Sequence, residues 1–318
     1  MDQEQSIDEI KKLADEGDAE SMFQYAEKLR KGEGISMNKK EAIKYYEKAA
    51  KLDHPKATFK YGLGLYYGVG IAINKKEASK YFKKAADLGD MHGMNYYSMM
   101  NEHGDGIEKN YEEAAKYIVK WAETGNVYGI YNYGVFLRDG IGMETNKELS
   151  IEYFTKAAEQ GFELAMRNLA VAYENGRDGA EIDLEKAAKY FKMAADKDEM
   201  YCVLRYVELL RTGRGVEQNY EEALKYLLKA IEKEDPDAFY IYADMLYNGE
   251  GVEQNYEESA KYFKKSADNG NRNGMLRYSE MVKNGKGVEK DEEESSKYFQ
   301  MAVQNGAFEN AEISCGIN

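Results

Sequence analysis

The sequence predicts an all-α protein, an α/α solenoid of eight antiparallel helix pairs. Two observations indicate this fold. The chain of 318 residues repeats a Gly-x-Gly turn eight times, every 36 residues with one step of 37, and it contains only two prolines among many residues that favour helix. A fixed period of this size is typical of stacked repeats and not of one globular core. The first glycines are Gly32, Gly68, Gly104, Gly140, Gly176, Gly213, Gly249 and Gly285.

The first helix of each repeat, called the A helix, is predicted to begin after a capping residue and to end at the Gly-x-Gly turn. The caps are Asp18, Asp90, Asn126, Asp235 and Asn271. Pro55 and Pro236 stand one residue after the cap position, where proline lacks no needed hydrogen bond. A small residue, a tyrosine four residues later and an apolar residue four further on recur in nearly every repeat. This spacing places them on one packed stripe.

The second helix of each repeat, called the B helix, has its own cap at the same place in every repeat. The caps are Asn38, Asn74, Asn110, Asn146, Asp183, Asn219, Asn255 and Asp291. Six of these eight are followed by Glu three residues later, which predicts a capping box. Alanines and aromatic residues form one face of the B helix, as in Ala42, Tyr45 and Tyr46, so aromatic rings are expected to fill the layer between helices.

The domain organisation follows the repeat. Residues 1–17 match a lone B helix capped by Asp2, residues 18–306 hold the eight repeats, and residues 307–318 begin a further A helix. The fifth repeat is one residue longer at Gly176–Gly179, which we interpret as a loop insertion. A calcium loop there is excluded because Gly176 replaces an early ligand.

Composition and sparse chemistry exclude several functional classes. The net charge of −14 disfavours nucleic acid as a partner. No apolar run reaches the length of a membrane span and the start resembles no signal peptide, so we expect a soluble, cytoplasmic protein. Cys202 and Cys315 are about three repeats apart, too far for a disulfide. The three histidines, His54, His92 and His103, are interpreted as surface residues. With no nucleophile and base pair nominated, we expect no enzyme, no metal and no cofactor.

The repeat resembles the Sel-1-like repeat family, which is related to the tetratricopeptide repeats. The resemblance rests on the small-x-x-x-aromatic-small stripe, Gly-x-Gly-Val/Ile, Asn-x-x-Glu-Ala, Lys-Tyr-Tyr/Phe and Ala-Ala-x-x-Gly, and it covers nearly the whole chain. It implies a right-handed superhelix with the A helices on the concave side, and an adaptor role. This chain has Tyr in mid-helix A where the family more often has Leu. It lacks the paired cysteines of secreted bacterial members and the signal peptide of endoplasmic-reticulum members, so neither subfamily's role transfers.

A variable face of the A helices is the candidate binding site. Columns that recur must pack against neighbouring repeats, whereas columns that differ are free of that constraint, and the differing columns share one helix face. We expect this face to be exposed and to bind a protein or peptide on the concave side. The candidate partner-binding residues are Phe59, Leu63, Tyr66, Tyr67, Met99, Tyr128, Tyr131, Val135, Tyr201, Tyr240 and Tyr247.

Two alternatives accompany this interpretation. Some of these aromatic residues could instead pack across the inside of the superhelix, and Trp121, which replaces a B-helix alanine, is expected in the core. The function predicted first is a non-catalytic scaffold, monomeric in solution. The alternative is a structural element that assembles end to end through its half-repeats.

Overall fold

The computed structural model describes residues 6–306, and in this range it contains 17 α-helices and no strand. The A helices are α2 (Ala19–Lys31), α4 (Pro55–Tyr67), α6 (Met91–His103), α8 (Val127–Asp139), α10 (Glu163–Asn175), α12 (Met200–Thr212), α14 (Pro236–Asn248) and α16 (Arg272–Asn284). The B helices are α3 (Lys39–Lys51), α5 (Lys75–Asp87), α7 (Tyr111–Glu123), α9 (Lys147–Glu159), α11 (Leu184–Ala195), α13 (Tyr220–Glu232), α15 (Tyr256–Asp268) and α17 (Glu292–Gln304). A lone helix, α1 (Ile7–Glu16), precedes them.

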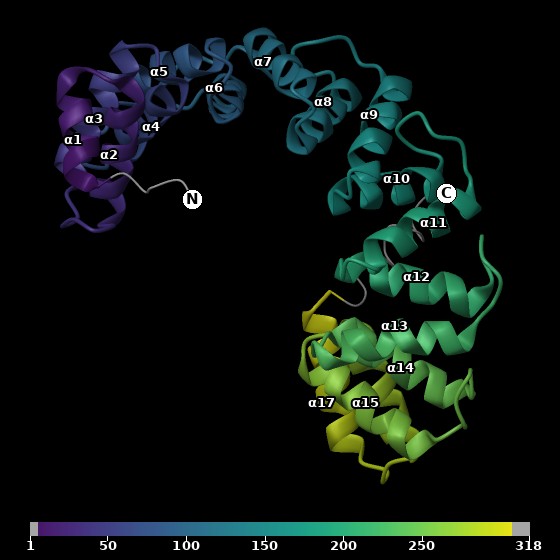
Figure 1. The fold of residues 1–318 in the computed structure, drawn as a ribbon. Helices are drawn as coiled ribbons and strands as arrows, with labels where there is room; N and C mark the ends of the chain where they lie inside the picture. The colour runs from purple at the N-terminus through teal and green to yellow at the C-terminus, as the bar shows by residue number, and fades with distance from the viewer. Residues whose placement is uncertain (1–5, 307–318) are drawn as a thin grey trace. The chain divides into compact units, whose positions relative to one another are not determined.

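The chain forms two compact parts, residues 1–162 and residues 163–318. The first, called the N-terminal part, holds α1 to α9, and the second, called the C-terminal part, holds α10 to α17. Within each part every helix packs against the next one along the chain, as Figure 1 shows. The predicted all-α solenoid of helix pairs is therefore confirmed.

The predicted B-helix caps are confirmed, but the capping box is only half formed. Each cap side chain accepts a hydrogen bond from the first turn, as Asn38 does from the Glu41 amide at 3.0 Å. The amide of the cap itself donates to the preceding A helix, for example from Asn38 to the Leu29 carbonyl at 2.9 Å. Because that amide is already satisfied, the Glu side chain is not needed there. In the third repeat Glu113 instead accepts a hydrogen bond from Lys83 at 3.0 Å.

The two glycines of each Gly-x-Gly turn have different tasks. The first ends the A helix in the left-handed region, as Gly140 does with φ of 67°. The second lets the turn approach the start of the preceding B helix. A Cβ added to Gly142 would lie 1.8 Å from the Tyr111 carbonyl oxygen, which no side chain can tolerate.

Small residues let the A and B helices of one repeat cross closely. Ser98 on α6 donates its hydroxyl to the Ala114 carbonyl on α7 at 2.9 Å, and Ser150 on α9 donates to the Gly134 carbonyl on α8 at 2.8 Å. These bonds need the two backbones almost in contact, because a serine side chain is short. The small columns seen in the sequence are therefore the points where helices cross.

Beside this crossing, a tyrosine of the A helix meets a tyrosine of the B helix edge to face. Seven of the eight repeats form such a pair, with ring centroids 4.5–5.2 Å apart and interplanar angles of 72–89°. The pairs are Tyr25–Tyr45, Tyr61–Tyr81, Tyr97–Tyr117, Tyr133–Tyr153, Tyr206–Tyr226, Tyr242–Tyr262 and Tyr278–Tyr298. The expectation that aromatic rings fill the layer between helices is confirmed.

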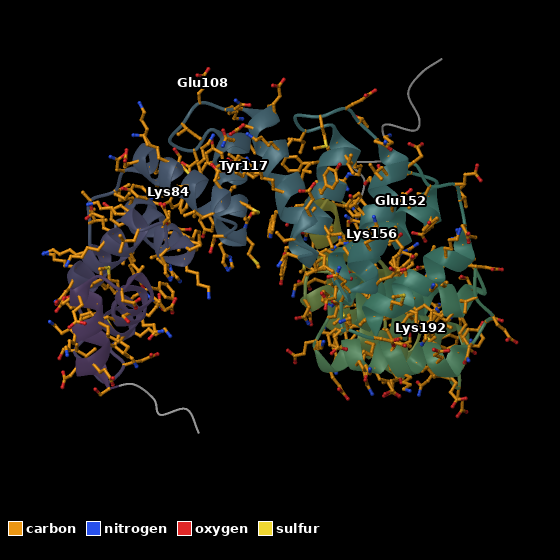
Figure 2. All side chains as sticks on the ribbon, turned by 45° about the horizontal axis from the view of Figure 1, so that its top comes forward. Lys84, Glu108, Tyr117, Glu152, Lys156 and Lys192 are labelled. Atoms are coloured by element: carbon orange, nitrogen blue, oxygen red, sulfur yellow. The ribbon has the colours of Figure 1, made fainter. Side chains whose placement is uncertain are left out.

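Polar bonds join consecutive B helices. The Tyr117 hydroxyl donates to Asp87 of the preceding B helix at 2.7 Å, and Lys120 lies 3.2 Å from the same carboxylate. Figure 2 labels Lys84, Tyr117 and Lys156 on three successive B helices of the N-terminal part. The Tyr45–Asp15 and Tyr298–Asp268 hydrogen bonds, both 2.6 Å, repeat the arrangement.

The ends of the array differ from the sequence prediction in one respect. Helix α1 begins at Ile7 and is capped by the Ser6 side chain, so Asp2 is not its cap. Ser6 fits because its hydroxyl reaches the Glu9 amide at 3.2 Å. Asp2 itself and the A helix predicted over residues 307–318 lie outside the described residues. The insertion in the fifth repeat falls in the loop between α10 and α11, as expected.

The turn between repeats gives a matched test of backbone strain. Glu234 and Gly270 occupy the same position in successive repeats, with φ of 57° and 92°. A Cβ on Gly270 would have no atom within 4 Å, so Gly270→Ala tests the backbone alone. We expect Gly270→Ala to destabilise the protein by about 1–2 kcal/mol, the cost of a left-handed L-residue. Glu234→Gly should stabilise it by less than ~1 kcal/mol, since glycine also loses more chain entropy on folding.

Urea unfolding followed by circular dichroism measures both effects. Glu234→Ala serves as the control, because it removes the carboxylate but keeps the left-handed strain, and it should leave the midpoint almost unchanged. A lower urea midpoint for Glu234→Gly than for Glu234→Ala would contradict the strain at this turn.

Candidate functional site

All eleven candidate residues lie on A helices, but they divide between the two parts. The N-terminal part contains eight of them, namely Phe59, Leu63, Tyr66, Tyr67, Met99, Tyr128, Tyr131 and Val135. The C-terminal part contains Tyr201, Tyr240 and Tyr247. Each group is therefore a separate candidate site.

A connected set of rings lies between α4, α5 and α6 in the N-terminal part. The Tyr66 ring is 6.0 Å from both Phe82 and Tyr96, and the Phe82 and Tyr96 rings are 5.0 Å apart. Phe59 joins this set, 5.4 Å from Tyr96 and stacked at 5.4 Å on His92. Only 5% of Phe59 is exposed. The prediction that Phe59 is exposed is wrong, because α6 places two rings over it.

Tyr66 is held by a hydrogen bond from its own side chain to the next repeat. Its hydroxyl donates to Asp105, the middle residue of a Gly-x-Gly turn, and Lys75 binds the same carboxylate at 2.6 Å. The hydrogen bond to Asp105, followed by burial, raises the pKa of Tyr66 to about 12. Lys75 and Tyr66 in turn lower the pKa of Asp105. The position of the Tyr66 side chain in the site is therefore fixed.

Two other candidate tyrosines project into solvent. Tyr67 is 57% exposed and its hydroxyl lies 3.3 Å from the Tyr96 hydroxyl. Tyr128 is 55% exposed and packs edge-on against Phe162 at 5.2 Å. Tyr131 is half-buried and contacts the same phenylalanine at 4.9 Å. Tyr67 and Tyr128 therefore present large apolar surfaces that the repeat packing does not use.

A cleft of about 760 Å³ runs beside α4 and α6 in this part. Phe23 and His54 form one wall, with their rings stacked at 4.9 Å. His54 also caps α4, since its ring accepts a hydrogen bond from the Ala57 amide at 3.1 Å and lies 3.0 Å from Glu20. The His54 side chain is only 11% exposed, so the prediction of a surface histidine is wrong for His54.

Several residues of this site were missed in the sequence. They are Phe23, Phe82, Tyr96 and Phe162. Tyr96 belongs to a column that directly precedes the recurring tyrosine and reads Lys60, Tyr96, Arg205 and Arg277 in four of the repeats. Because this column alternates between large polar and aromatic residues, it could have been recognised as a surface that does not pack against neighbouring repeats.

On the A-helix face of the C-terminal part, charged side chains of the protein pair with one another. Arg211 binds three carboxylates, Glu250 at 2.6 Å, Asp244 at 2.9 Å and Glu208 at 3.2 Å. Its side chain is almost buried, so these pairs are well shielded from water.

Two of the three candidate tyrosines of this part, Tyr247 and Tyr201, are engaged by cations. The Lys286 amine donates to the Tyr247 hydroxyl at 2.7 Å, and Arg277 lies 4.8 Å from the Tyr247 ring centre. Arg167 covers the Tyr201 ring at 4.5 Å. Burial, followed by the charge of Asp244, raises the pKa of Tyr240.

Catalytic and metal chemistry find little support among the described residues. Within residues 6–306 no group of three or more His, Cys, Asp or Glu side chains is arranged to hold a metal ion. The thiol of Cys202 is buried, and burial raises its pKa, which makes it a poor nucleophile. Trp121 lies in the core, as predicted. None of the helices in this range has the length and apolar character of a membrane span.

Alkaline titration tests how firmly the tyrosines are held. Burial raises the pKa of Tyr61 and Tyr96 to about 12, as the Asp105 hydrogen bond does for Tyr66. An unfolded tyrosine ionises near pH ~10. Between these values the unfolded chain releases protons that the folded chain keeps, so stability present below about pH 10 is lost as the pH rises toward 12.

Tyrosinate absorbance and circular dichroism should therefore change together above about pH 10. Tyr66→Phe should be less stable at neutral pH, because Asp105 loses a donor, and its stability should fall less steeply with pH. Ionisation of Tyr61, Tyr66 and Tyr96 near pH ~10 with the helices intact would contradict the buried arrangement.

Comparison with known proteins identifies the repeat. The Sel1 repeat matches residues 19–54, 55–90, 92–126, 127–162, 164–199, 208–235, 236–271 and 273–306. Among curated proteins, no sequence matches the chain. A crystal structure of a protective antigen present in uropathogenic Escherichia coli strains, which displays an SLR fold, has a TM-score of 0.88 at 22% identity and covers 95% of this chain. This chain spans 65% of that protein.

A second solved structure, a Sel1 repeat protein from Oxalobacter formigenes, has a TM-score of 0.73 at 25% identity. The match covers 94% of this chain and 87% of that protein. Proteins built from Sel1 repeats generally act as non-catalytic scaffolds for protein interactions. Because the eight matched segments account for most of residues 19–306, the chain belongs to the Sel1 repeat family.

Proposed function

We propose that the chain is a non-catalytic scaffold that binds a partner protein or peptide on the A-helix face of the N-terminal part. Two observations carry the proposal: the aromatic cleft beside α4 and α6, and the exposed rings of Tyr67 on α4 and Tyr128 on α8. Exposed aromatic residues around a cleft are typical of protein-binding surfaces, where they contribute most of the binding energy.

The fixed aromatic side chains of this site support the same proposal. Tyr66, Tyr96 and Phe59 are locked by ring contacts and by the bond to Asp105. A binding surface that is already ordered loses little conformational entropy when a partner binds. The site is therefore well suited to an extended peptide or to a helix laid along the cleft.

Substitution of exposed tyrosines tests this proposal without damaging the fold. Peptides are first selected from a displayed random library on the wild-type chain, and their affinities are then measured by fluorescence polarisation. We expect Tyr67→Ala with Tyr128→Ala to weaken binding at least about tenfold, which corresponds to about 1.4 kcal/mol. Tyr66 and Tyr131 are left unchanged because both are half-buried among other rings.

Tyr111→Ala is the matched control, since Tyr111 is 48% exposed but begins the B helix α7. It should bind the selected peptides like the wild type. Equal affinities for the wild type and the double variant, with intact helices, would reject this face as the binding site.

Self-assembly is a second candidate, and one observation favours it. Val303 on α17 is 45% exposed, whereas alanines at the same position of earlier repeats, such as Ala86 and Ala158, are buried. A second copy that covered this apolar face would extend the stack. We expect light scattering to show a mass that rises with concentration and Val303→Lys to suppress the rise. A constant monomer mass would rule assembly out.

A further inference from the structure

A second pocket adjoins the cleft and lies between α2, α3 and α4. It has a volume of about 430 Å³, and its apolar lining includes Met37, Ile43, Leu63 and Val69. Leu63 and Lys60 also line the larger cleft, so α4 contributes to both spaces.

The pocket exists because one repeat lacks a side chain that others use to fill this place. Gly64 stands at its floor, where five other repeats have a large buried residue. These residues are Met100, Phe136, Leu209, Met245 and Met281. A Cβ on Gly64 would lie 2.2 Å from the Ile43 Cδ1 atom, so Ile43 occupies part of the missing volume and the remainder stays open.

The rim of this pocket is positively charged, although the whole chain carries −14. Arg30, Lys39 and Lys60 line it, and no carboxylate of the described residues does. The nearest acid, Glu27, already accepts two bonds from Arg30, at 2.6 and 3.3 Å, and one from Tyr46.

These contacts leave two of the rim cations available. Lys60 is 3.9 Å from Glu27, too far for a hydrogen bond, and Lys39 forms no ion pair with any residue between 6 and 306. An apolar pocket whose rim carries the unpaired Lys39 and the weakly paired Lys60 matches an apolar group that is bonded close to a carboxylate.

We propose that this pocket binds an apolar side chain, such as Leu or Met, from an acidic segment of the partner protein. The side chain fills the space above Gly64, and neighbouring Asp or Glu residues of the partner pair with Lys39 and Lys60. This inference rests on the proposed function and specifies the chemistry of its partner. A peptide fits better than a small anion because α4 also lines the larger cleft, where further residues of the same peptide can bind.

Reversing the charge of the rim lysines tests the proposal, because an unfolded variant would lose binding and would not reverse its preference between peptides. The probe is a short fluorescein-labelled peptide with one central Leu flanked by Asp and Glu. The comparison peptides replace Leu by Ala or the acids by Lys. We expect the wild type to prefer the acidic Leu peptide over its Ala form by at least about tenfold, since a buried Leu alone contributes that much. It should also prefer the acidic Leu peptide over the Lys-flanked form, because the rim of the pocket is positively charged.

The variant Lys39→Glu with Lys60→Glu should reverse the preference and bind the Lys-flanked peptide more tightly than the acidic one. The control is Lys44→Glu on α3, an exposed lysine that does not line the pocket. It should keep the wild-type order of affinities.

Methyl NMR locates the bound side chain. The Ile43 Cδ1 methyl lies at the pocket floor and should shift with the acidic Leu peptide but not with its Ala form, whereas Ile151, at the same position of α9, should not shift. Decanoate is added as a competitor that carries the same chemistry in a lipid. If decanoate displaces the acidic Leu peptide at equal concentration, the peptide assignment is overturned.

The inference is also overturned if charge reversal leaves the order of the three peptides unchanged. The proposed function fails separately, if library-selected peptides bind the Tyr128→Ala variant as tightly as the wild type. A set of peptides that depends on Tyr128 but not on Lys39 and Lys60 would therefore keep the scaffold and reject the acidic partner.

Discussion

The edge-to-face contact between one tyrosine of each A helix and one of each B helix is the interaction on which the array depends. The ring pair sets the separation of the two helices, and it adds about 0.5–1.5 kcal/mol beyond the area it buries. The B-helix hydroxyl leaves the layer at its edge, where Tyr117 reaches Asp87 of the preceding repeat. One residue thus stabilises its own repeat and joins it to the one before. The fifth repeat, with Leu169, instead stacks Tyr190 on Tyr173 at 6.0 Å.

The sequence was sufficient to predict the helix pairs, their caps and their packed columns, because these features recur and depend on contacts inside a repeat or with its neighbour. It was less informative about exposure. Phe59 belongs to a variable column, yet it is buried because α6 happens to supply Tyr96 and His92 above it. His54 was not recognised as a cap, because imidazole is an unusual substitute for Asp or Asn. Which neighbour covers a variable residue depends on the neighbour's own variable residues.

The middle residue of the Gly-x-Gly turn explains much of that variation. The turn of one repeat lies against the A helix of the repeat before it, and its middle side chain reaches that helix. Asp105 accepts the Tyr66 hydroxyl, Glu250 binds Arg211 and Lys286 donates to Tyr247. The geometry is the same in all three, and the chemistry differs. The residue between the two glycines therefore influences whether the face of the preceding A helix is aromatic or ionic.

This difference supports the N-terminal part as the face of the proposed binding site. On the C-terminal part, a partner that approached Arg211 would have to replace its bonds to Asp244 and Glu250, and breaking a shielded ion pair leaves a charge without its counterion. On the N-terminal part, Tyr67 and Tyr128 already face water, and covering them removes apolar surface without breaking any ion pair. Near Gly64, Lys39 has no ion pair among the described residues, and Lys60 has only a long one, to Glu27 at 3.9 Å. For the proposed partner, the favourable terms of association therefore concentrate in the N-terminal part, where Tyr67 and Tyr128 are exposed and Lys39 forms no ion pair with the described residues.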